Sequence, residues 1–311
     1  MVSNKPKLIF STSSYEYLLD EVAQTNEFEK GALEIKFFPD GERYQRILSD
    51  VLSRDVVVIG GTISDEATLE LYDLAYALIK YGAQSITIVM PYFGYSTMER
   101  AVKSGEIVTA KSRAGMFSAL PRTSLGNHFV FFDLHSEGLP HYFEGAVLTS
   151  HIYCKPIIIA AATEVAGDNL VMACTDAGRA KWVESLANDM GVNAAFVFKR
   201  RISGEETAVT SISADVVGKN VVIYDDMIRT GGSLIGAAKA YKEAGAKDIF
   251  TITTHGLFSS DGWRKIKEAG VISRIITTNS HPNAAKAASD SDGFVQVRSI
   301  ASLIKEKLKQ I

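Results

Sequence analysis

The chain has 311 residues, of which 46% are hydrophobic, so it is long enough to fill two cores of ordinary size. Its formal net charge is −3 and no long run of either sign occurs. This balance excludes the basic surface expected of a protein that binds nucleic acid or an anionic membrane. Small anionic ligands would have to be met by local clusters of charge.

The cysteine content and the hydropathy pattern indicate the cellular compartment. Cys154 and Cys174 are too few for a disulfide framework and lie in apolar stretches, as reduced thiols of a cytosolic protein do. The first residues lack the apolar region of a signal peptide, and no stretch approaches the roughly 18 consecutive apolar residues of a membrane helix. We therefore expect a soluble, cytoplasmic protein without a membrane segment.

Strands alternate with helices through the first half of the chain. Strand patterns at residues 7–10 and 33–38 enclose a helix. A buried strand at 56–59 precedes a helix that ends at Gly82, and the next strand covers 86–90. This alternation predicts parallel βαβ units and therefore an α/β fold.

The second half repeats this arrangement about 165 residues later. A strand at 221–224, a helix to Ala244 and a strand at 249–253 have the same order and spacing as their counterparts in the first half. The repeat predicts two tandem domains, each a mainly parallel sheet flanked by helices.

The predicted domains cover residues 1–147 and 148–298. Residues 139–150 are expected to connect the two halves, and a helix at 151–165 with Pro156 in its first turn opens the second domain. Residues 299–311 have apolar side chains on one helical face. This closing helix is expected to pack on one of the domains and to join the first.

The most informative stretch follows the strand at 221–224. It contains Asp225 and Asp226, then the turn Thr230-Gly231-Gly232-Ser233, and then a helix pattern from Leu234. In a parallel sheet, this is where glycines and a helix N-terminus present backbone amides to a phosphate. Two carboxylates about 5 Å apart repel by roughly 3 kcal/mol, which implies a cation or hydroxyl donors between them. The alternative is an acidic turn capped by glycines.

Residues 225–233 resemble the binding loop for 5-phosphoribosyl 1-pyrophosphate (PRPP) that phosphoribosyltransferases and ribose-phosphate pyrophosphokinases (PRPP synthetases) share. The resemblance implies two phosphoribosyltransferase-like domains. It also implies that Asp225 and Asp226 hold the ribose hydroxyls of ribose 5-phosphate. The 5-phosphate would be bound by a set of loop residues: Arg229, Thr230, Gly231, Gly232 and Ser233.

The duplication favours the synthetase over the transferase. The first copy has Gly60-Gly61 in place of the acids and lacks the Thr-Gly-Gly turn, so only the second copy is expected to hold a ribose phosphate. Synthetases of this family are built as two such domains in tandem. Similarity therefore implies transfer of pyrophosphate from Mg-ATP to the anomeric hydroxyl of ribose 5-phosphate, which gives PRPP and AMP. The alternatives are a phosphoribosyltransferase and a non-catalytic, PRPP-binding regulatory homologue.

Two further strand ends carry metal and pyrophosphate candidates. His135 follows the apolar strand 131–132 and Asp133, and this segment resembles the one whose His holds the ATP-bound metal in the family. The residues Asp176, Ala177, Gly178 and Arg179 match the family's pyrophosphate loop, except that Arg179 replaces its second Gly. His135 and Asp176 are thus the predicted ligands of Mg²⁺. A hydrogen-bonded His and a plain Asp N-cap are the structural alternatives.

A basic segment at 199–201 supplies the predicted catalytic cations. Lys199 and Arg201 match the Lys and Arg of the family's flexible catalytic loop, and such cations neutralise charge that develops on transferring phosphoryl oxygens. The alternative is a set of solvated charges at a strand end.

The predicted ATP site uses Phe38, Asp40, Glu42, Glu99, Arg100 and His135. Residues 38–42 resemble the loop that cradles adenine from a neighbouring subunit, which implies a homo-oligomer, a dimer or hexamer; a tight turn explains them equally well. Thr97 and Met98 replace the Arg and Gln that contact ATP in most synthetases. Residues 92–110 resemble instead the plant-type (class II) group, which is not activated by phosphate and accepts several nucleoside triphosphates. His255 also matches the family and is expected to be structural.

Overall fold

The computed structural model describes residues 5–25, 27–203 and 206–311, with all their side chains except those of Ala177, 198–203 and 206–211. The chain forms two compact units. Unit 1 comprises Met1–Ile152 and Ala301–Ile311, and unit 2 comprises Tyr153–Ile300. Among the described residues, none of the helices combines the length and the apolar composition that a membrane crossing needs.

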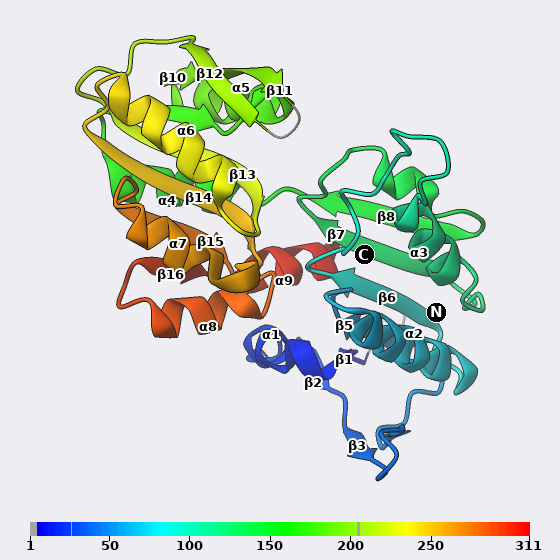
Figure 1. Ribbon diagram of the computed structural model, residues 1–311. Helices are drawn as coiled ribbons and strands as arrows, with labels where there is room; N and C mark the ends of the chain where they lie inside the picture. Colours follow the sequence, from blue (N-terminus) through cyan, green and yellow to red (C-terminus); the bar gives the residue numbers. More distant parts are fainter. Residues whose placement is uncertain (1–4, 26, 204–205) are drawn as a thin grey trace. The chain divides into compact units, whose positions relative to one another are not determined.

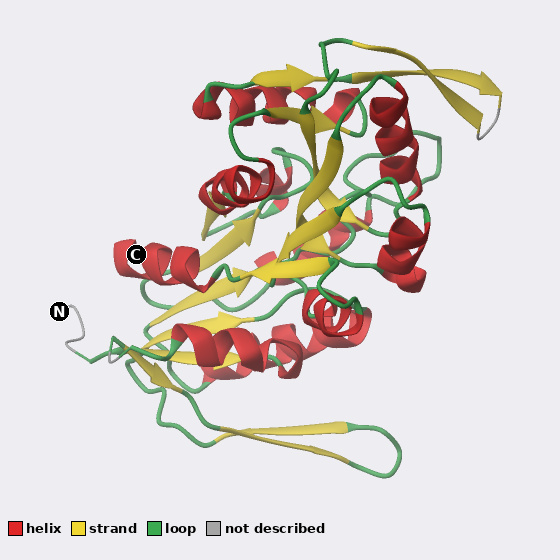
Figure 2. Ribbon diagram, turned by 90° about the vertical axis from the view of Figure 1, so that its left-hand side faces the viewer, coloured by secondary structure: helices red, strands yellow, loops and turns green. Residues whose placement is uncertain are grey.

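Unit 1 contains a six-stranded sheet in which all neighbours are parallel, in the order β2-β1-β5-β6-β7-β8 (Figure 1). Its strands are β1 (Lys7–Ser11), β2 (Phe28–Lys30), β5 (Asp55–Ile59), β6 (Ser85–Met90), β7 (Asn127–Phe132) and β8 (Val147–Ile152). An antiparallel hairpin of β3 (Leu33–Phe37) and β4 (Arg43–Ile47) projects from this unit (Figure 2).

Helices cover both faces of this sheet. The helices α2 (Asp65–Lys80) and α3 (Thr109–Ser118) connect strands that advance in one direction, so right-handed crossovers place both on one face. The connection from β1 to β2 runs the opposite way through η1 (Ser13–Tyr15) and α1 (Glu16–Val22), which places α1 on the other face. There α1 packs against the C-terminal helix α9 (Ala301–Gln310).

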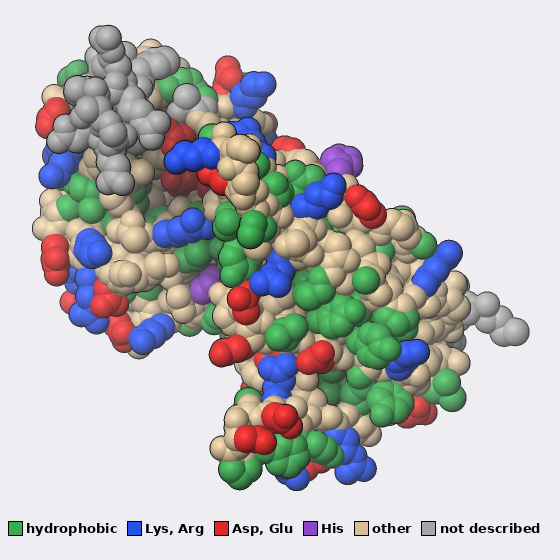
Figure 3. All heavy atoms as spheres, turned by 45° about the vertical axis from the view of Figure 1, so that its right-hand side comes forward, with side chains coloured by type: hydrophobic (Ala, Val, Ile, Leu, Met, Phe, Trp, Pro, Cys, Tyr) green, Lys and Arg blue, Asp and Glu red, His purple; other side chains and the backbone are tan. Residues whose placement is uncertain are grey.

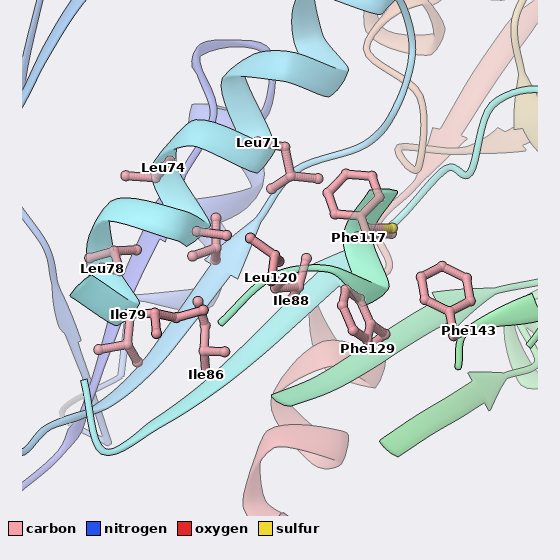
Figure 4. Close-up of a cluster of buried hydrophobic side chains, with 14 of the residues drawn as sticks. Leu71, Leu74, Leu78, Ile79, Ile86, Ile88, Phe117, Leu120, Phe129 and Phe143 are labelled. Carbon is pink, nitrogen blue, oxygen red and sulfur yellow. The ribbon is translucent and has the colours of Figure 1, made fainter. Parts of the chain in front are cut away.

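The core of unit 1 forms where α2 and α3 meet the sheet (Figure 4). Leu71, Leu74 and Leu78 recur at helical spacing on α2 and are all buried. Phe117 of α3 meets Phe129 of β7 edge to face, with ring centroids 6.2 Å apart. The helical period of apolar residues therefore decides which face of α2 turns to the sheet.

Unit 2 repeats the sheet of unit 1 with the order β10-β9-β13-β14-β15-β16, again parallel throughout. Its strands are β9 (Leu170–Cys174), β10 (Asn193–Ala195), β13 (Asn220–Ile228), β14 (Asp248–Gly256), β15 (Arg274–Thr278) and β16 (Val295–Arg298). The strands β13 and β14 occupy the sheet positions that β5 and β6 have in unit 1. The predicted duplication and the α/β class are confirmed.

The helices of unit 2 follow the same plan. They are α4 (Lys155–Ala166), α5 (Ala180–Met190), α6 (Gly232–Glu243), α7 (Gly262–Glu268) and α8 (Asn283–Asp290), with short 3₁₀ turns η3 (Ala177–Arg179) and η4 (Ser259–Asp261). The helix α4 packs against α5 as α9 packs against α1 in unit 1. Cys154 and Cys174 are buried free thiols, and burial raises the pKa of Cys174 to about 11.

Two segments differ from the sequence prediction. Residues 139–150, predicted as a connection, contain η2 (Leu139–Tyr142) and most of β8. The strand β8 lies at the sheet edge and no residue of it is fully buried, so it lacks the apolar run that marks a buried strand. The helix predicted from residue 151 begins at Lys155, with Pro156 in its first turn as expected.

The second difference concerns the basic segment. The backbone forms β11 (Val197–Ser203) and β12 (Glu206–Ile212), which pair antiparallel, where the sequence predicts a flexible loop. Residues 206–212 are rich in β-branched side chains, which favour a strand.

His281 lies buried just before α8, where its Nδ1 accepts a hydrogen bond from the backbone N–H of Asn283 at 3.2 Å. Burial, and then the nearby His255, lower the pKa of His281 from 6.5 to about 3. The unfolded chain takes up this proton near pH 6.5 and the folded chain only near pH 3. The free energy of unfolding of unit 2 therefore falls as the pH drops between these values.

We expect the substitution His281→Asn to reduce this loss of stability in acid, because the amide oxygen can accept the same hydrogen bond without titrating. Urea unfolding followed by tryptophan fluorescence between pH 7 and pH 4 measures the effect. Both tryptophans, Trp182 and Trp263, belong to unit 2 and so report on it. Equal pH dependence of the unfolding midpoint in both proteins would contradict the prediction.

Candidate active site

The strand β13 carries the acid pair and is longer than the sequence predicts. It continues to Ile228 and so includes Asp225 and Asp226, whereas the prediction ended it at Tyr224. On one side, pairing with β9 stops at Tyr224, opposite Cys174; on the other, pairing with β14 continues to Ile228. The two acids therefore lie at the carboxyl end of the sheet, on a flank where β9 has given way to its following loop.

Three groups fix the carboxylates of the pair. The hydroxyl of Thr175 donates to Oδ2 of Asp225 at 3.0 Å, and the backbone N–H of Asp226 donates to Oδ1 of Asp225 at 3.0 Å. The guanidinium of Arg179 lies with Nη2 2.5 Å from Oδ2 of Asp226, whose side chain is 3% exposed. Both carboxylates are thus held in place by neighbours from the loop after β9 and from β13 itself.

The two acids do not have the same electrostatic environment. Burial, followed by the charge of Asp226 and a hydrogen bond with it, raises the pKa of Asp225 to about 7. The Thr175 hydroxyl and the charge of Arg179 act in the opposite direction. Asp225 therefore keeps its proton to a higher pH than an ordinary aspartate does.

The loop at residues 229–233 is shaped by glycine. Gly231 has a φ of +82° and precedes α6, and a Cβ there would lie 2.6 Å from Cγ1 of Ile266 on α7. A Cβ on Gly262 would lie 2.2 Å from the backbone oxygen of Arg229, so α7 packs directly beneath this loop. Arg229, Thr230, Gly232 and Ser233 are exposed. Only glycine fits at Gly231, and the other loop residues face solvent.

Tyr241 of α6 connects this region to the neighbouring strand ends. Its buried hydroxyl lies 3.1 Å from each of the backbone oxygens of Cys174 and Ala195, to which it donates. These oxygens belong to the last residues of β9 and β10. The helix that begins at the glycine loop is thereby fixed against the strand that leads into residues 175–179.

The loop after β9 contains the predicted pyrophosphate residues. Oδ1 of Asp176 accepts a hydrogen bond from the backbone N–H of Gly178 at 2.8 Å, which closes a tight turn, and Asp176 is exposed. The turn continues into η3 and places Arg179 beside Asp226. The side chain of Ala177 lies outside the described residues. Arg179 therefore contacts the acid pair, a partner that the sequence does not indicate.

The predicted catalytic residues Lys199 and Arg201 lie on β11. Their backbones pair with Val209 and Thr207 of β12, respectively. Their side chains are outside the described residues.

Three of the predicted ATP residues lie at the turn of the β3–β4 hairpin. Phe38 is 52% exposed, its backbone N–H donates to the backbone oxygen of Glu42 at 2.9 Å, and Oδ1 of Asp40 accepts from the backbone N–H of Glu42 at 3.1 Å. Gly41 has a φ of +92°. These contacts make the tight turn that the sequence allowed as the alternative, with its aromatic side chain in solvent.

The other ATP residues lie at the carboxyl edge of the unit 1 sheet. Glu99 and Arg100 belong to the segment after β6, where Nε of Arg100 is 3.6 Å from Oε1 of Glu99 and the hydroxyl of Tyr142 donates to the backbone oxygen of Glu99 at 2.5 Å. His135 is half-buried and follows β7, and Asp133 before it is buried with a φ of +34°. Since β6 and β7 are neighbours, their following segments share one sheet edge.

In unit 1, buried side chains fill the space at the position equivalent to the acid pair. A Cβ on Gly61 would lie 2.2 Å from the hydroxyl of Tyr15, and a Cβ on Gly60 would lie 2.8 Å from both Leu71 and Thr12. Tyr15 is fully buried. Side chains therefore cannot be added at this point of the first copy, which explains why it carries no acids.

The donors near the site suit a hard cation in type. Asp176 and Asp225 offer carboxylate oxygens, and Mg²⁺ commonly takes only one or two of these together with water and phosphate. Among residues 5–25, 27–203 and 206–311, no group of three or more His, Cys, Asp or Glu side chains forms a preformed metal site. His135 belongs to unit 1 and Asp176 to unit 2.

Several residues that shape the site were not predicted. Thr175 directly precedes the predicted pyrophosphate residues, but its bond to Asp225 depends on the pairing of β9 with β13. Gly262, Ile266 and Tyr241 act by packing across elements, which leaves no local pattern in the sequence. His255 is buried, and its Nδ1 lies 2.8 Å from the hydroxyl of Ser280.

Comparison with known proteins gives two family matches. Residues 7–120 match the model of the N-terminal domain of ribose phosphate pyrophosphokinase, and residues 175–311 match the phosphoribosyl synthetase-associated domain. Ribose-phosphate pyrophosphokinase of Mycoplasma genitalium is 32% identical, with 90% of this chain and 85% of the relative covered.

A plant relative and a solved structure give the same result. Ribose-phosphate pyrophosphokinase 2, chloroplastic, of Spinacia oleracea is 32% identical over 91% of this chain and 71% of the relative. The crystal structure of phosphoribosylpyrophosphate synthetase from Mycobacterium smegmatis superposes with a TM-score of 0.85 at 26% identity and covers 98% of both chains.

The acid pair yields a prediction on stability. Because the pKa of Asp225 is about 7 in the folded protein and near 3.8 in the unfolded chain, the folded state binds the extra proton between these values. The free energy of unfolding then falls as the pH rises from about 4 to about 7. Asp225→Asn should remove this loss and raise the melting temperature of the ligand-free protein at pH 8 by several degrees.

Asp226→Asn is the matched control. It leaves the largely buried Arg179 without its carboxylate partner and should lower the melting temperature at the same pH. Thermal unfolding at pH 5 and pH 8 measures both variants, and the gain from Asp225→Asn should shrink at pH 5. If the two substitutions change stability in the same direction at pH 8, this description of the pair is wrong.

Proposed function

The chain belongs to the family of ribose-phosphate pyrophosphokinases, and we propose that its ribose 5-phosphate binds at the carboxyl end of β13 in unit 2. Enzymes of this family transfer the pyrophosphoryl group of ATP to ribose 5-phosphate, which gives PRPP and AMP for nucleotide biosynthesis. The observation that carries the proposed site is the acid pair of β13, held by Thr175 and Arg179 directly before the glycine loop.

Each part of this loop has a chemical role. Carboxylates of Asp225 and Asp226 accept hydrogen bonds from the ribose hydroxyls. The backbone amides of residues 230–233, at the start of α6, bind the 5-phosphate together with the hydroxyls of Thr230 and Ser233. The exposed Arg229 adds a positive charge for the same phosphate. Gly231 allows the close approach because its φ and its packing exclude a side chain.

The transfer step needs positioning and charge neutralisation. The anomeric hydroxyl of ribose 5-phosphate attacks the β-phosphorus of ATP in line, and AMP leaves. Lys199 and Arg201 stabilise the negative charge on the transferring group, and residues 176–179 hold the pyrophosphate. The position of residues 176–179 supports their part in this step, because Thr175 and Arg179 at the two ends of this loop contact the acid pair.

The nucleotide site uses residues of unit 1. Glu99, Arg100, His135 and the hairpin residues Phe38, Asp40 and Glu42 would bind ATP, and His135 and Asp176 are each a candidate ligand for its metal. Mg²⁺ held by such residues would supply positive charge to the phosphates of ATP. The support is that Glu99, Arg100 and His135 follow adjacent strands at the carboxyl edge of the sheet, where ligands of such sheets bind.

Two features of the sequence stay predictions. The resemblance of residues 92–110 to the plant-type group rests on that segment alone. Overall identity does not favour a plant relative, because the spinach and the Mycoplasma relatives are both 32% identical to this chain. The cytoplasmic location is likewise a prediction from composition. A purified protein that requires phosphate for activity would contradict the first, and fractionation of the source cells tests the second.

Release of AMP from ATP and ribose 5-phosphate, without any nucleobase, is the direct test of the proposed reaction. A phosphoribosyltransferase or a regulatory homologue would give none. The assay is run with several nucleoside triphosphates, with and without inorganic phosphate. We expect AMP formation that depends on ribose 5-phosphate and does not require added phosphate.

Lys199→Ala serves as the catalytic control in this assay. Turnover should fall by roughly 100-fold or more, as for loss of one group that stabilises transition-state charge, while the fold measured by circular dichroism is unchanged. Activity equal to that of the wild type would exclude Lys199 from the mechanism.

We infer further that the protein forms homo-oligomers through unit 1. Figure 3 shows hydrophobic side chains lying together on one face of the protein. The exposed large hydrophobic residues of unit 1 include Phe37, Phe38, Leu48, Leu52, Leu69, Tyr76 and Tyr81. A hollow of about 750 Å³ lies between β4 and α2. Several large apolar side chains exposed on one unit are typical of a protein interface.

Sedimentation velocity tests the assembly. We expect a dimer or hexamer at micromolar concentration, and dissociation on replacing Phe37 and Phe38 with Ser. Leu148→Ser, a change at a side chain of unit 1 that is 64% exposed on β8, should leave the assembly intact. A wild-type protein that is monomeric at all concentrations would contradict the inference.

A further inference from the structure

Arg179 brings a positive charge into the proposed ribose site. Its Nη2 lies 2.5 Å from Oδ2 of Asp226, and the side chains of Arg179 and Asp226 are 17% and 3% exposed. A contact this short between largely buried partners is a charge-assisted bond, stronger than an ion pair on the surface. Arg179 is therefore part of the acid pair's surroundings and not a solvated cation.

The position of Arg179 is fixed by the loop that carries it. The backbone N–H of Gly178 donates to Oδ1 of Asp176 at 2.8 Å, and the thiol of Cys174 lies 2.9 Å from the backbone oxygen of Asp176. Thr175, which follows Cys174, donates a hydrogen bond from its hydroxyl to Asp225. The same short loop thus supplies a hydroxyl donor to the first acid and a guanidinium to the second.

A pair of acids that binds a sugar diol has an electrostatic problem. When the sugar excludes water, the repulsion between the two carboxylates increases, because the local dielectric constant falls. A proton on one of the acids or a cation next to the pair relieves this repulsion, and a divalent metal is one such cation. In this chain, the guanidinium of Arg179 already occupies one side of Asp226 and supplies a charge that cannot be lost by deprotonation.

We propose that Arg179 takes the place of a divalent cation at the acid pair, so that this protein binds ribose 5-phosphate without metal. The inference rests on the proposed function, since it concerns the sugar site of the same reaction. Mg²⁺ is then required for the nucleotide half of the reaction and not for the sugar half. Arg179 acts as a positioning residue that holds the side chain of Asp226 in place.

Calorimetric titration of ribose 5-phosphate into the ATP-free protein tests the proposal, in phosphate-free buffer with either EDTA or excess Mg²⁺. We expect the wild type to have nearly the same Kd in both buffers. For Arg179→Ala, we expect the Kd in EDTA to be about tenfold or more above its Kd in Mg²⁺, because the metal then has to supply the missing charge.

Two further variants serve as controls. Arg179→Lys keeps the charge and should bind the sugar phosphate equally well with and without Mg²⁺, although more weakly than the wild type because the planar fork is lost. Arg274→Ala removes an arginine from the start of β15, at the opposite edge of the same sheet, and should behave as the wild type. If Arg179→Ala does not fold, the wild type and Arg179→Lys decide the question.

The possible results separate this inference from the proposed function. A wild-type protein that binds ribose 5-phosphate in Mg²⁺ but loses it in EDTA overturns the role of Arg179 and leaves the sugar site intact. Equal Kd values for Arg179→Ala in both buffers also overturn it. A wild-type protein that does not bind ribose 5-phosphate in either buffer contradicts the proposed function, and the inference fails with it.

Discussion

Two adjacent carboxylates at the end of one strand are the constraint on which unit 2 depends. Asp225 and Asp226 repel each other, and burial increases this cost, so the surrounding structure has to supply donors and a cation. It does so through one short loop, where Thr175 donates to Asp225 and Arg179 contacts Asp226. This loop reaches the acids because β9 ends its pairing at Cys174 while β13 continues to Ile228. The sheet register thus determines the electrostatics of the site.

The duplicated sheet shows how one architecture keeps a site in one copy and closes it in the other. Both sheets have the same strand order, and β5 occupies the position of β13. After β5, however, the chain has Gly60 and Gly61, and the buried Tyr15 fills the space that side chains would need. In unit 2, the hydroxyl of Tyr241 fixes α6 to the ends of β9 and β10. Core packing at one point therefore explains why the first copy has no acid pair where the second has one.

Local patterns in the sequence predicted the elements that dominate the fold. The buried strands, the helix from Asp65 and the turn at Gly231 follow from apolar period and glycine content, and the repeat predicted the second sheet. The edge strand β8 was missed because its half-exposed residues give no apolar run. The Arg179 contact and the packing of Ile266 beneath Gly231 were not predictable, since both depend on which distant elements the sheet brings together. The family resemblance proposed the loop residues but not these partners.

The most direct test of this account is a crystal structure of the protein with ribose 5-phosphate. We predict density for the phosphate at the backbone amides of residues 230–233 and for the ribose hydroxyls within hydrogen-bonding distance of Asp225 and Asp226. Arg179 should stay in contact with Asp226 in that complex. A sugar phosphate bound elsewhere in unit 2, or a site that stays empty at saturating concentration, would contradict the account.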